Sequence, residues 1–147
     1  MMKWILIGIF VFSAAIGAGF YFFKGSSGGP ATEVDWRLLA KMDYIENKAS
    51  DDLKVHDGQR VKIPGFMVPL EDNQKQVVEF LLVPSPQACI HVPAPPPNQM
   101  VYVKMKKGVP AAFGPIWVYG DLKITVKKSQ YGEASFELTA DYVEPYR

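Results

Sequence analysis

An uncharged apolar run near the amino terminus is the feature that most constrains this chain. The run from Trp4 to Phe23, WILIGIFVFSAAIGAGFYFF, contains no Asp, Glu, Lys or Arg. At about 1.5 Å per residue, about 20 such residues make a helix about 30 Å long, which matches the hydrocarbon thickness of a bilayer. The run therefore predicts a transmembrane helix, with residues 1–24 as a membrane anchor.

Two interpretations of this run differ in whether it stays on the mature protein. A cleaved signal peptide would use Lys3 as its charged start and a small residue such as Ala15 at its cleavage site. However, the apolar run continues to Phe23, and Trp4 lies where interfacial aromatic residues lie in membrane helices. We therefore expect an uncleaved single-pass anchor whose amino terminus lies on the cytoplasmic side of the membrane. Either interpretation carries the rest of the chain across the membrane.

The charge and cysteine content of the exported part excludes two classes of protein. The chain has 16 Lys and Arg, of which Lys3 and Lys24 flank the apolar run, against 15 Asp and Glu. The exported part is therefore nearly neutral and has no global field that would hold nucleic acid. The single cysteine, Cys89, excludes an internal disulfide, so the domain depends on its hydrophobic core for stability.

A linker and a helix are expected after the apolar run. Residues 25–33, GSSGGPATE, have the composition of a flexible linker. One amphipathic helix is predicted over Val34–Lys48, because Leu38, Met42 and Ile45 recur near the helical period. Its apolar side is expected to pack on the domain that follows.

Five β-strands are predicted after this helix, because apolar and polar residues alternate between turn signals. They cover Arg60–Leu70, Val77–Val83, Met100–Lys106, Ile116–Lys128 and Ala134–Val143. The alternation in the last strand places four residues on one side, namely Phe136, Leu138, Ala140 and Tyr142.

Glycines within the strands favour a curved sheet. Gly65 and Gly120 interrupt the first and fourth strands, and strands that bend at glycines tend to curl and close. We therefore expect residues 34–147 to form a mainly β domain, a small five-stranded OB-like barrel preceded by the amphipathic helix. A β-sandwich or an open five-stranded roll is the alternative, because residues 108–115, GVPAAFGP, are too few for the helix that an OB fold usually carries there.

The most unusual stretch is QACIHVPAPPPNQ, Gln87 to Gln99. Cys89 and His91 are two residues apart, so in an extended segment both side chains point to the same side. A thiolate and an imidazole suit zinc or cuprous copper, but a zinc site needs three or four protein ligands. His56 and Asp57, which precede the first strand, are the candidates that would complete the set.

Two other interpretations of Cys89 stay open. A partly buried free cysteine behaves as a small hydrophobic residue. A nucleophilic thiol with His91 as its base would need backbone donors for an oxyanion, whereas the prolines that follow remove backbone donors. The sequence therefore favours a structural cysteine and indicates no enzymatic reaction.

The proline run from Pro93 to Pro97 predicts an extended polyproline II arm. Such arms are rigid and solvated and are common recognition elements. Alternatively, the prolines bridge two strands without leaving an edge that would aggregate.

An aromatic and basic surface is the second candidate site. The alternation points five side chains outward on two strands, namely Tyr102, Lys104, Trp117, Tyr119 and Lys123. If the two strands are neighbours, these residues form one surface that suits a protein partner, lipid headgroups or a glycan. Alternatively, the helix predicted over residues 34–48 covers the aromatic rings.

Three stretches carry a family resemblance: DGQRVKIPGFMVPLE, EFLLVPSPQACIHVPAPPPNQMVYVK and PIWVYGDLKI. In this order they resemble a bacterial domain-of-unknown-function family, number 3299, over about Trp36 to Tyr142. The most specific motif of that family is Cys-x-His followed by prolines and Asn-Gln. The positions that match it are Cys89, His91, Pro95, Pro96, Pro97, Asn98 and Gln99.

The resemblance implies a location and a partner but no reaction. Members of the family are exported or lipid-anchored in Gram-negative bacteria and are often encoded beside ABC transporters, in some cases within zinc-responsive operons. This chain departs from them in having an apparent transmembrane anchor in place of a lipid-attachment cysteine. We expect an accessory or binding module of an envelope complex, on the periplasmic side of the inner membrane, with ABC transporter subunits as partners. The alternative is a periplasmic zinc-handling protein that uses Cys89 and His91.

Overall fold

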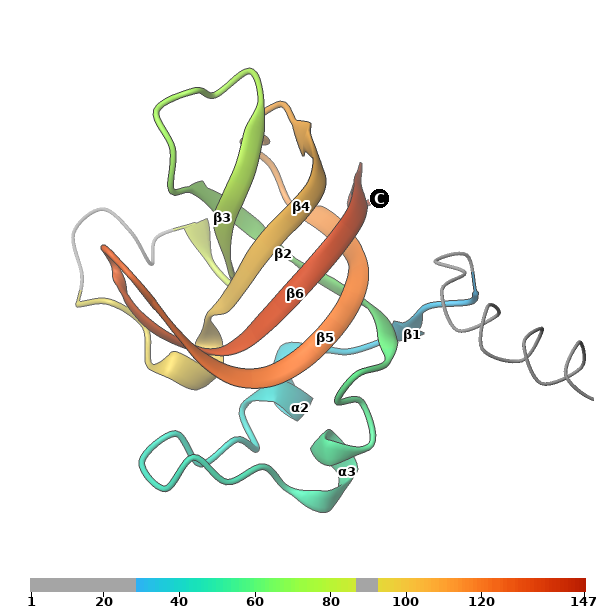
Figure 1. The fold of residues 1–147 in the computed structure, drawn as a ribbon, viewed down its shortest axis with the longest axis vertical. Helices are drawn as coiled ribbons and strands as arrows, with labels where there is room; N and C mark the ends of the chain where they lie inside the picture. Colours follow the sequence, from blue (N-terminus) through green and yellow to red (C-terminus); the bar gives the residue numbers. More distant parts are fainter. Residues whose placement is uncertain (1–28, 87–92) are drawn as a thin grey trace, which may run out of the picture.

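The computed structural model describes residues 29–86 and 93–147, which form a mainly β structure with two short helices (Figure 1). The strands are β1 (Thr32–Glu33), β2 (Arg60–Pro69), β3 (Val77–Val83), β4 (Val101–Val109), β5 (Ile116–Ser129) and β6 (Gly132–Pro145). The helices α2 (Trp36–Leu39) and α3 (Asp51–Lys54) precede β2, and a 3-10 turn, η3 (Pro97–Gln99), precedes β4. The mainly β class predicted from the sequence is confirmed, and β2 to β6 correspond to the five predicted strands.

The six strands form one sheet in the order β1–β2–β3–β4–β6–β5. Neighbouring strands pair antiparallel, except that β4 and β6 run parallel, as do β1 and β2. β2 also pairs with β5, through residues 60–65 and 116–121, so the pairings of β2 to β6 lead back to β2. β1 was not predicted: Thr32 and Glu33, which their composition placed in the linker, pair with Val61 and Lys62 of β2.

Alternate residues of the strands form the main hydrophobic core. Burial alternates along β2, where Val61 and Ile63 are fully buried. The other strands contribute further fully buried side chains, among them Phe80, Leu82, Val101, Val103, Val118, Phe136 and Leu138. The two helices lie below the strands in Figure 1 and add Leu39 from α2 and Leu53 from α3 to this core.

The prediction of one amphipathic helix over Val34–Lys48 is wrong, because this range holds the four-residue helix α2 followed by a tight turn over residues 43–48, and α3 begins only at Asp51. In the turn, Oδ1 of Asp43 accepts hydrogen bonds from two backbone N–H groups that follow it, both at 3.0 Å. The backbones of Asp43 and Lys48 pair with each other, and Asn47 takes a positive φ of 53°. Asp and Asn side chains offer the backbone an alternative to helical hydrogen bonds, so these residues outweighed the apolar spacing.

β5 and β6 approach each other closely at Gly120. A Cβ on Gly120 would lie 2.3 Å from the backbone oxygen of Thr139, so a larger residue would force the strands apart. The register shifts at the same place, because Tyr119 pairs with Tyr142 whereas Gly120 pairs two residues earlier. Asp141 is therefore the extra residue of a β-bulge.

The bulge changes which side chains point outward beyond it. Sequence alternation placed Tyr142 on the same side as Phe136, Leu138 and Ala140, and those three residues are fully buried. Tyr142 is 45% exposed instead, and Val143 packs against the core. Side chains along a strand alternate between the two faces of the sheet, so one extra residue moves every later side chain to the other face. The prediction that Tyr142 points into the core is therefore wrong.

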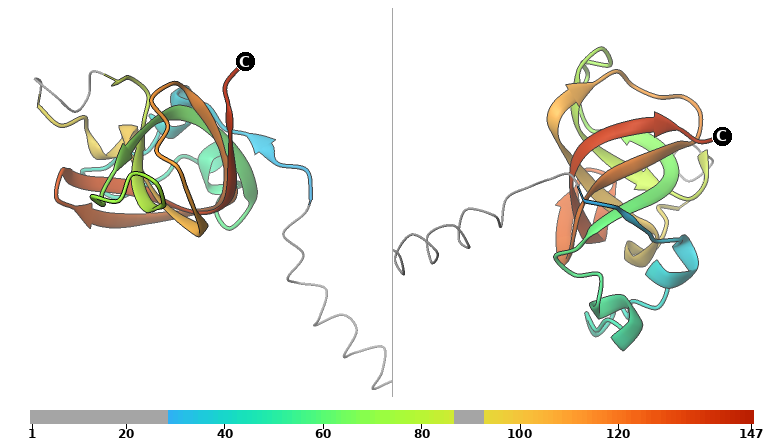
Figure 2. Two further views of the ribbon diagram at one scale, coloured as in Figure 1. Left: turned by 90° about the horizontal axis from the view of Figure 1, so that it is seen from above. Right: turned by 90° about the vertical axis from the view of Figure 1, so that its right-hand side faces the viewer.

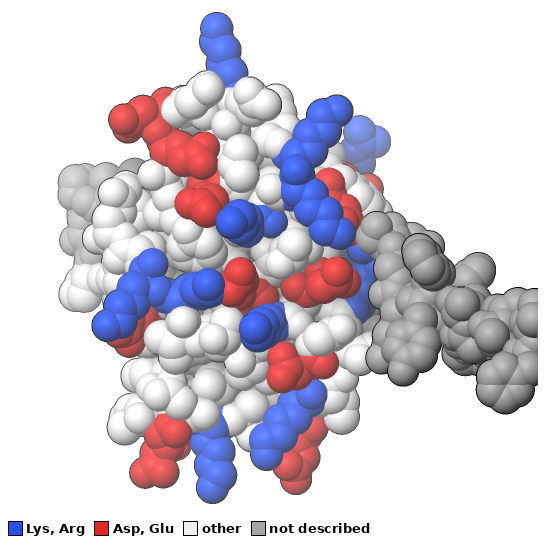
Figure 3. All heavy atoms as spheres, in the orientation of Figure 1, with Lys and Arg blue, Asp and Glu red and all other residues white. Residues whose placement is uncertain are grey.

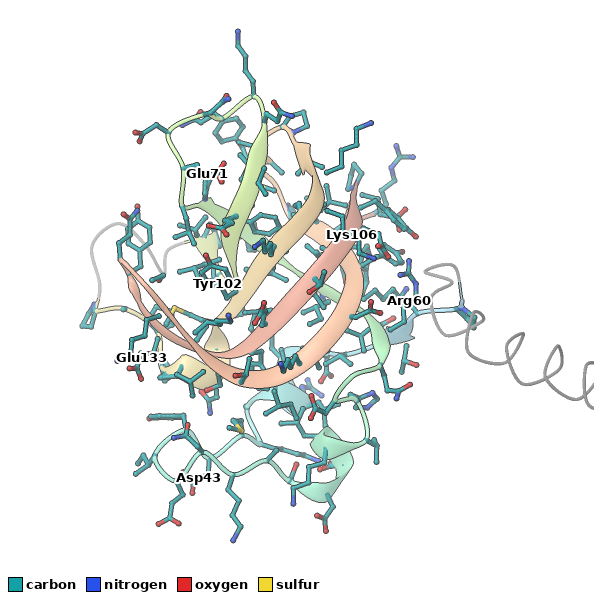
Figure 4. All side chains as sticks on the ribbon, in the orientation of Figure 1. Asp43, Arg60, Glu71, Tyr102, Lys106 and Glu133 are labelled. Atoms are coloured by element: carbon teal, nitrogen blue, oxygen red, sulfur yellow. The ribbon has the colours of Figure 1, made fainter. Side chains whose placement is uncertain are left out.

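Asp141, the bulged residue, joins three strands through ion pairs. Its carboxylate contacts the guanidinium of Arg60 on β2 and, at 2.7 Å, Nζ of Lys106 on β4. Arg60 and Lys106 are labelled in Figure 4. The side chains of Arg60 and Asp141 are 15% and 16% exposed. Burial by itself would raise the pKa of Asp141, but the hydrogen bonds from Lys106 and Arg60 outweigh burial and lower that pKa.

The membrane anchor predicted over residues 1–24 lies outside the described residues. Within residues 29–86 and 93–147, no helix has the length and apolar character needed to cross a bilayer. The anchor therefore stays a prediction from the sequence.

Substitution of Gly120 tests the close approach of β5 and β6. Gly120→Ala should lower the free energy of unfolding by about 2–3 kcal/mol, because the added methyl group meets backbone atoms that cannot move separately. Gly114→Ala is the matched control, since a Cβ there has no atom within 4 Å, and it should change stability by less than about 0.5 kcal/mol. Urea unfolding of the full chain in detergent measures both variants. Equal stability of the two would contradict the close approach.

The ion pairs of Asp141 predict a defined pH dependence. Asp141→Asn should cost about 1–3 kcal/mol near pH 7, because charge-assisted hydrogen bonds are lost and Arg60 loses its counter-ion. The folded-state pKa of Asp141 is lowered. The wild-type advantage is therefore present above the unfolded-state pKa of about 3.9 and is lost as the pH falls through the folded-state pKa. Urea unfolding between about pH 7 and pH 2.5 should show the difference shrink only below about pH 4.

The control for this pH series is Asp51→Asn. Asp51 pairs with Lys54 at 3.4 Å with its side chain fully exposed, so the variant should cost less than about 0.5 kcal/mol at each pH. A difference between wild type and Asp141→Asn that stays constant down to the lowest pH would show that Asp141 is not held by these ion pairs.

Candidate functional site

The described part of the proline motif begins with residues 93–97, here called the proline arm. Pro93 and Pro96 are exposed, and Pro95 and Pro97 are half-buried. Pro96 has φ −62° and ψ 155°, which is the polyproline II conformation. The arm therefore presents two prolines to solvent, and its backbone is extended at Pro96 before the chain enters η3 at Pro97.

Asn98 fixes the end of the proline arm to α2. Its Nδ2 donates hydrogen bonds to the backbone oxygens of Ala40 and Met42, both at 3.2 Å. Ala40 is the C-cap of α2, so Asn98 satisfies carbonyl groups that a helix end leaves without helical partners. The next residue, Gln99, donates its Nε2 to the carbonyl of Asn98.

His56 and Asp57 lie in the turn between α3 and β2, and hydrogen bonds fix this turn to β5. Oδ1 of Asp57 accepts from the backbone N–H of Ile124 at 2.9 Å, and the N–H of Gly58 donates to the carbonyl of Leu122 at 2.7 Å. The carboxylate of Asp57 thus completes the backbone hydrogen bonding of β5. His56 is half-buried beside it.

The zinc set of Cys89, His91, His56 and Asp57 stays a prediction. Cys89 and His91 lie outside the described residues. In the described parts of the chain, no group of three or more His, Cys, Asp or Glu side chains is placed to hold a metal ion. A zinc ion bound here would have to share the Asp57 carboxylate with the backbone of β5.

The aromatic and basic surface predicted from two strands divides into two parts, because β6 lies between β4 and β5. Tyr102 and Lys104 lie on β4, whereas Trp117, Tyr119 and Lys123 lie on β5. The two groups therefore contact different neighbours.

Tyr102 belongs to a second apolar cluster. It lies between core residues of β4, so its side chain points to the opposite face of the sheet. The buried members of the cluster are Leu81, Val83, Met100 and Ala134, and Phe66, Val68, Leu70 and Tyr102 pack against them. Burial, followed by the interaction with Glu79, raises the pKa of Tyr102. Tyr102 is therefore a packing residue whose hydroxyl stays protonated.

Four aromatic residues form a surface, here called the aromatic face: the half-buried Trp117 and Tyr119 and the exposed Tyr142 and Tyr146. The rings of Tyr119 and Tyr142 stack with their centroids 4.3 Å apart. Those of Trp117 and Tyr146 lie 5.1 Å apart at a tilt of 32°. Tyr142 and Tyr146 are 45% and 49% exposed, so the segment that precedes β2 leaves both rings open to solvent.

Lys62 connects the aromatic face to β1. Its Nζ lies 4.4 Å from the centroid of the Trp117 ring, in cation–π contact, and 3.5 Å from Oε2 of Glu33 in β1. The aromatic face therefore borders the strand through which the chain enters the sheet. A hydrogen bond from the Tyr119 hydroxyl to Glu144 raises the pKa of Tyr119 to about 12, so this ring stays neutral at ordinary pH.

Two hollows adjoin the aromatic face. One of about 210 Å³ is lined by Trp36, Pro64, Gly65, Phe66, Pro84, Pro115 and Tyr146. The other, of about 320 Å³, is lined by Trp117, Glu144, Pro145 and Arg147. Trp36 donates a hydrogen bond from Nε1 to the carbonyl of Pro64 at 2.6 Å, which fixes its ring at the edge of the first hollow. Rings and prolines dominate the first hollow, whereas the second combines a ring with charges of both signs.

A sequence profile described as a protein of unknown function, DUF3299, matches residues 37–145. The chain belongs to the DUF3299 family. It is similar to the crystal structure of a DUF3299 protein from Pseudomonas aeruginosa at 34% sequence identity and a TM-score of 0.66. That match covers 81% of this chain and 98% of the other. No curated protein matches the chain. The family predicted from the motifs is thereby confirmed.

Sequence reasoning missed Lys62, Tyr142 and Tyr146 as neighbours of Trp117 and Tyr119 in this DUF3299 protein. The bulge concealed Tyr142, and Tyr146 lies beyond the last predicted strand. Lys62 faces Tyr119 only through the pairing of β2 with β5, which joins residues far apart in the chain. The one available signal was the stretch DYVEPYR, which contains both tyrosines.

The proline arm and the aromatic face of the DUF3299 domain lie on different sides. Both views place the arm and the β5–β6 hairpin opposite β1 (Figures 1 and 2), and Ala94 of the arm lies near Gly132 in that hairpin. The aromatic face instead borders β1 through Lys62. Charges of both signs are interspersed on the surface in Figure 3, so this view shows no strong field of one sign.

Asn98 provides a test of how the proline arm is held. Asn98→Ala should lower the free energy of unfolding by about 1–2 kcal/mol, because the carbonyls of Ala40 and Met42 lose their donor. Asn98→Asp should cost more, since a carboxylate would face two carbonyl oxygens. Gln99→Ala is the matched control and should cost less than about 0.5 kcal/mol. Urea unfolding measures all three, and equal effects of Asn98→Ala and Gln99→Ala would contradict the anchoring role.

Proposed function

We propose that this DUF3299 protein is a membrane-anchored accessory module that faces the periplasm and binds a protein partner within an envelope complex. The proposed partner is a subunit of an inner-membrane ABC transporter, as the family resemblance implies. The proline arm is the proposed contact. The apolar run from Trp4 to Phe23 supplies the anchor.

We further propose that β2 to β6 form a small OB-like barrel. The pairings support this, because their order leads from β2 through β3, β4, β6 and β5 back to β2. An OB fold is a five-stranded Greek-key barrel. In the proposed barrel, β1 is an additional strand. The helix that an OB fold usually carries between its third and fourth strands is missing from the short β4–β5 connection, and α2 and α3 contribute the buried residues Leu39 and Leu53 instead.

The conformation of the proline arm is the single observation that carries the proposed function. Pro93 and Pro96 are exposed, and the backbone at Pro96 is already extended as polyproline II. Asn98 ties the arm to α2 by two hydrogen bonds. Binding of such an arm costs little conformational entropy, because its prolines and the hydrogen bonds of Asn98 already restrict its backbone. Exposed rigid prolines without a charge of their own favour a protein partner over nucleic acid.

Recovery of the transporter with arm variants tests this proposal. The full chain, extracted in mild detergent, should co-purify with an ABC transporter subunit identified by mass spectrometry. Replacing Pro93 and Pro96 together by Glu should lower the recovery about tenfold, because charge and lost rigidity are placed at the contact. The matched control replaces Ile45 and Val55 by Glu, two residues that are 82% and 65% exposed elsewhere, and should leave recovery unchanged.

Two results would count against the proposal. Recovery of no transporter subunit above background with the wild-type chain would reject the partner. Unchanged recovery with the arm variant, once its unfolding curve matches that of the wild type, would reject the arm as the contact.

A further inference from the structure

We propose that the aromatic face lies against the phospholipid headgroup layer and so holds the proline arm pointing away from the membrane. This inference rests on the membrane anchor of the proposed function. It goes beyond that function because it assigns a ligand to a second surface and an orientation to the domain.

The first argument is the length of chain between the apolar run and the sheet. Residues 24–31 separate the run from β1, which begins at Thr32. Fully extended at about 3.5 Å per residue, about eight residues reach at most about 28 Å. The domain therefore cannot move far from the bilayer, and a surface beside β1 meets the headgroups at high local concentration.

The second argument is that the aromatic face is the surface beside β1. Glu33 of β1 contacts Lys62, and Lys62 lies over the ring of Trp117. In register, Lys62 of β2 faces Tyr119 of β5, which in turn faces Tyr142 of β6. These contacts and pairings lead from β1 through Lys62 to the rings of the aromatic face.

The third argument is the chemistry of this surface. Trp and Tyr rings favour the membrane interface, because one end of each ring is apolar and the other makes hydrogen bonds. Phe113, which is 89% exposed, lies in the loop just before β5. The backbone N–H of Tyr146 donates to the carbonyl of Pro115 at 3.0 Å, which ties this loop to the aromatic face. An apolar side chain that projects into solvent two residues before Pro115 suits insertion among headgroups.

The charges of the surface indicate which headgroups it fits. Lys62 and Arg147 are accompanied by Glu33 and Glu144. The surface therefore lacks the excess of basic residues that recognises anionic lipid. We expect contact through aromatic insertion with zwitterionic and anionic headgroups alike.

The consequence of this contact is an orientation. The proline arm and the β5–β6 hairpin lie on the opposite side from β1 in both views (Figures 1 and 2). With the aromatic face against the bilayer, the arm is directed away from the lipid, toward the periplasmic parts of a partner.

Fluorescence quenching by lipid tests the inference. The full chain carries Cys89→Ser and a single new cysteine, either Phe113→Cys at the aromatic face or Tyr131→Cys in the distant β5–β6 hairpin. Each is labelled with a nitrobenzoxadiazole dye and incorporated into nanodiscs. Phosphatidylcholine with a spin label near its headgroup should quench the dye at position 113 at least about threefold more than at position 131, because interfacial residues lie at headgroup depth. Discs with added phosphatidylglycerol should give the same ratio.

Variants of the aromatic face test whether its rings cause the quenching. In the Phe113→Cys background, replacing Trp117 and Tyr146 together by Ala should lower quenching to the level at position 131. The matched control replaces Tyr44 and Ile45 by Ala, both exposed and away from the face, and should leave quenching unchanged. Should the double variant unfold, Tyr146→Ser alone removes an exposed ring near the last residue and should give a partial loss.

The outcomes separate this inference from the proposed function. Equal quenching at positions 113 and 131 in a chain that stays in the nanodisc overturns the lipid contact and leaves the anchor intact. Quenching that persists in the Trp117 and Tyr146 double variant and in Tyr146→Ser overturns the role of the rings. Quenching that appears only with phosphatidylglycerol overturns aromatic insertion in favour of charge. A chain that does not remain with the nanodisc rejects the anchor itself.

Discussion

The pairing of β2 with β5 is the constraint on which the rest of the structure depends. It joins residues 60–65 to residues 116–121 and so connects the first long strand to one near the end of the chain. The core forms because this pairing turns the alternate residues of β2 and β5 toward those of β3, β4 and β6. The same pairing sets Lys62 opposite Tyr119 on the outer side. One set of backbone hydrogen bonds thus defines both the buried core and the exposed aromatic face.

The bulge at Asp141 shows how a local backbone irregularity decides a surface. Gly120 allows β6 to approach β5 closely, and the extra residue directs Asp141 toward Arg60 and Lys106. One of these ion pairs joins β6 to β4, its neighbour in the sheet, and the other joins β6 to β2, which does not neighbour it. Because the extra residue changes which face of the sheet the following side chains point to, Tyr142 points outward and its ring stacks on that of Tyr119. Stability and the aromatic face therefore depend on the same few residues.

The two candidate contact surfaces have different physical origins. The proline arm has an extended backbone at Pro96, where proline fixes φ, and Asn98 fixes the end of the arm by two hydrogen bonds to backbone oxygens at and just beyond the end of α2. The aromatic face is assembled from β5, β6 and Lys62 of β2, and no local sequence rule orders it. A module with one surface for the membrane and another for a partner would hold that partner at a fixed orientation and distance from the bilayer. A short tether and a nearly neutral domain are compatible with this role.

The sequence by itself determined the mainly β class, the five long strands, the polyproline II backbone at Pro96 and the family. Each of these follows from local rules: alternation of period two, the fixed φ of proline, and a motif of adjacent residues. The tertiary structure decided β1, the replacement of a long helix over residues 34–48 by α2 and a turn at Asp43 and Asn47, and the separation of Tyr102 from Trp117 by β6. It also decided the outward turn of Tyr142. These features depend on strand order, a one-residue register shift and contacts between residues far apart in the chain, and alternation along a single strand carries no information about which strand lies beside it.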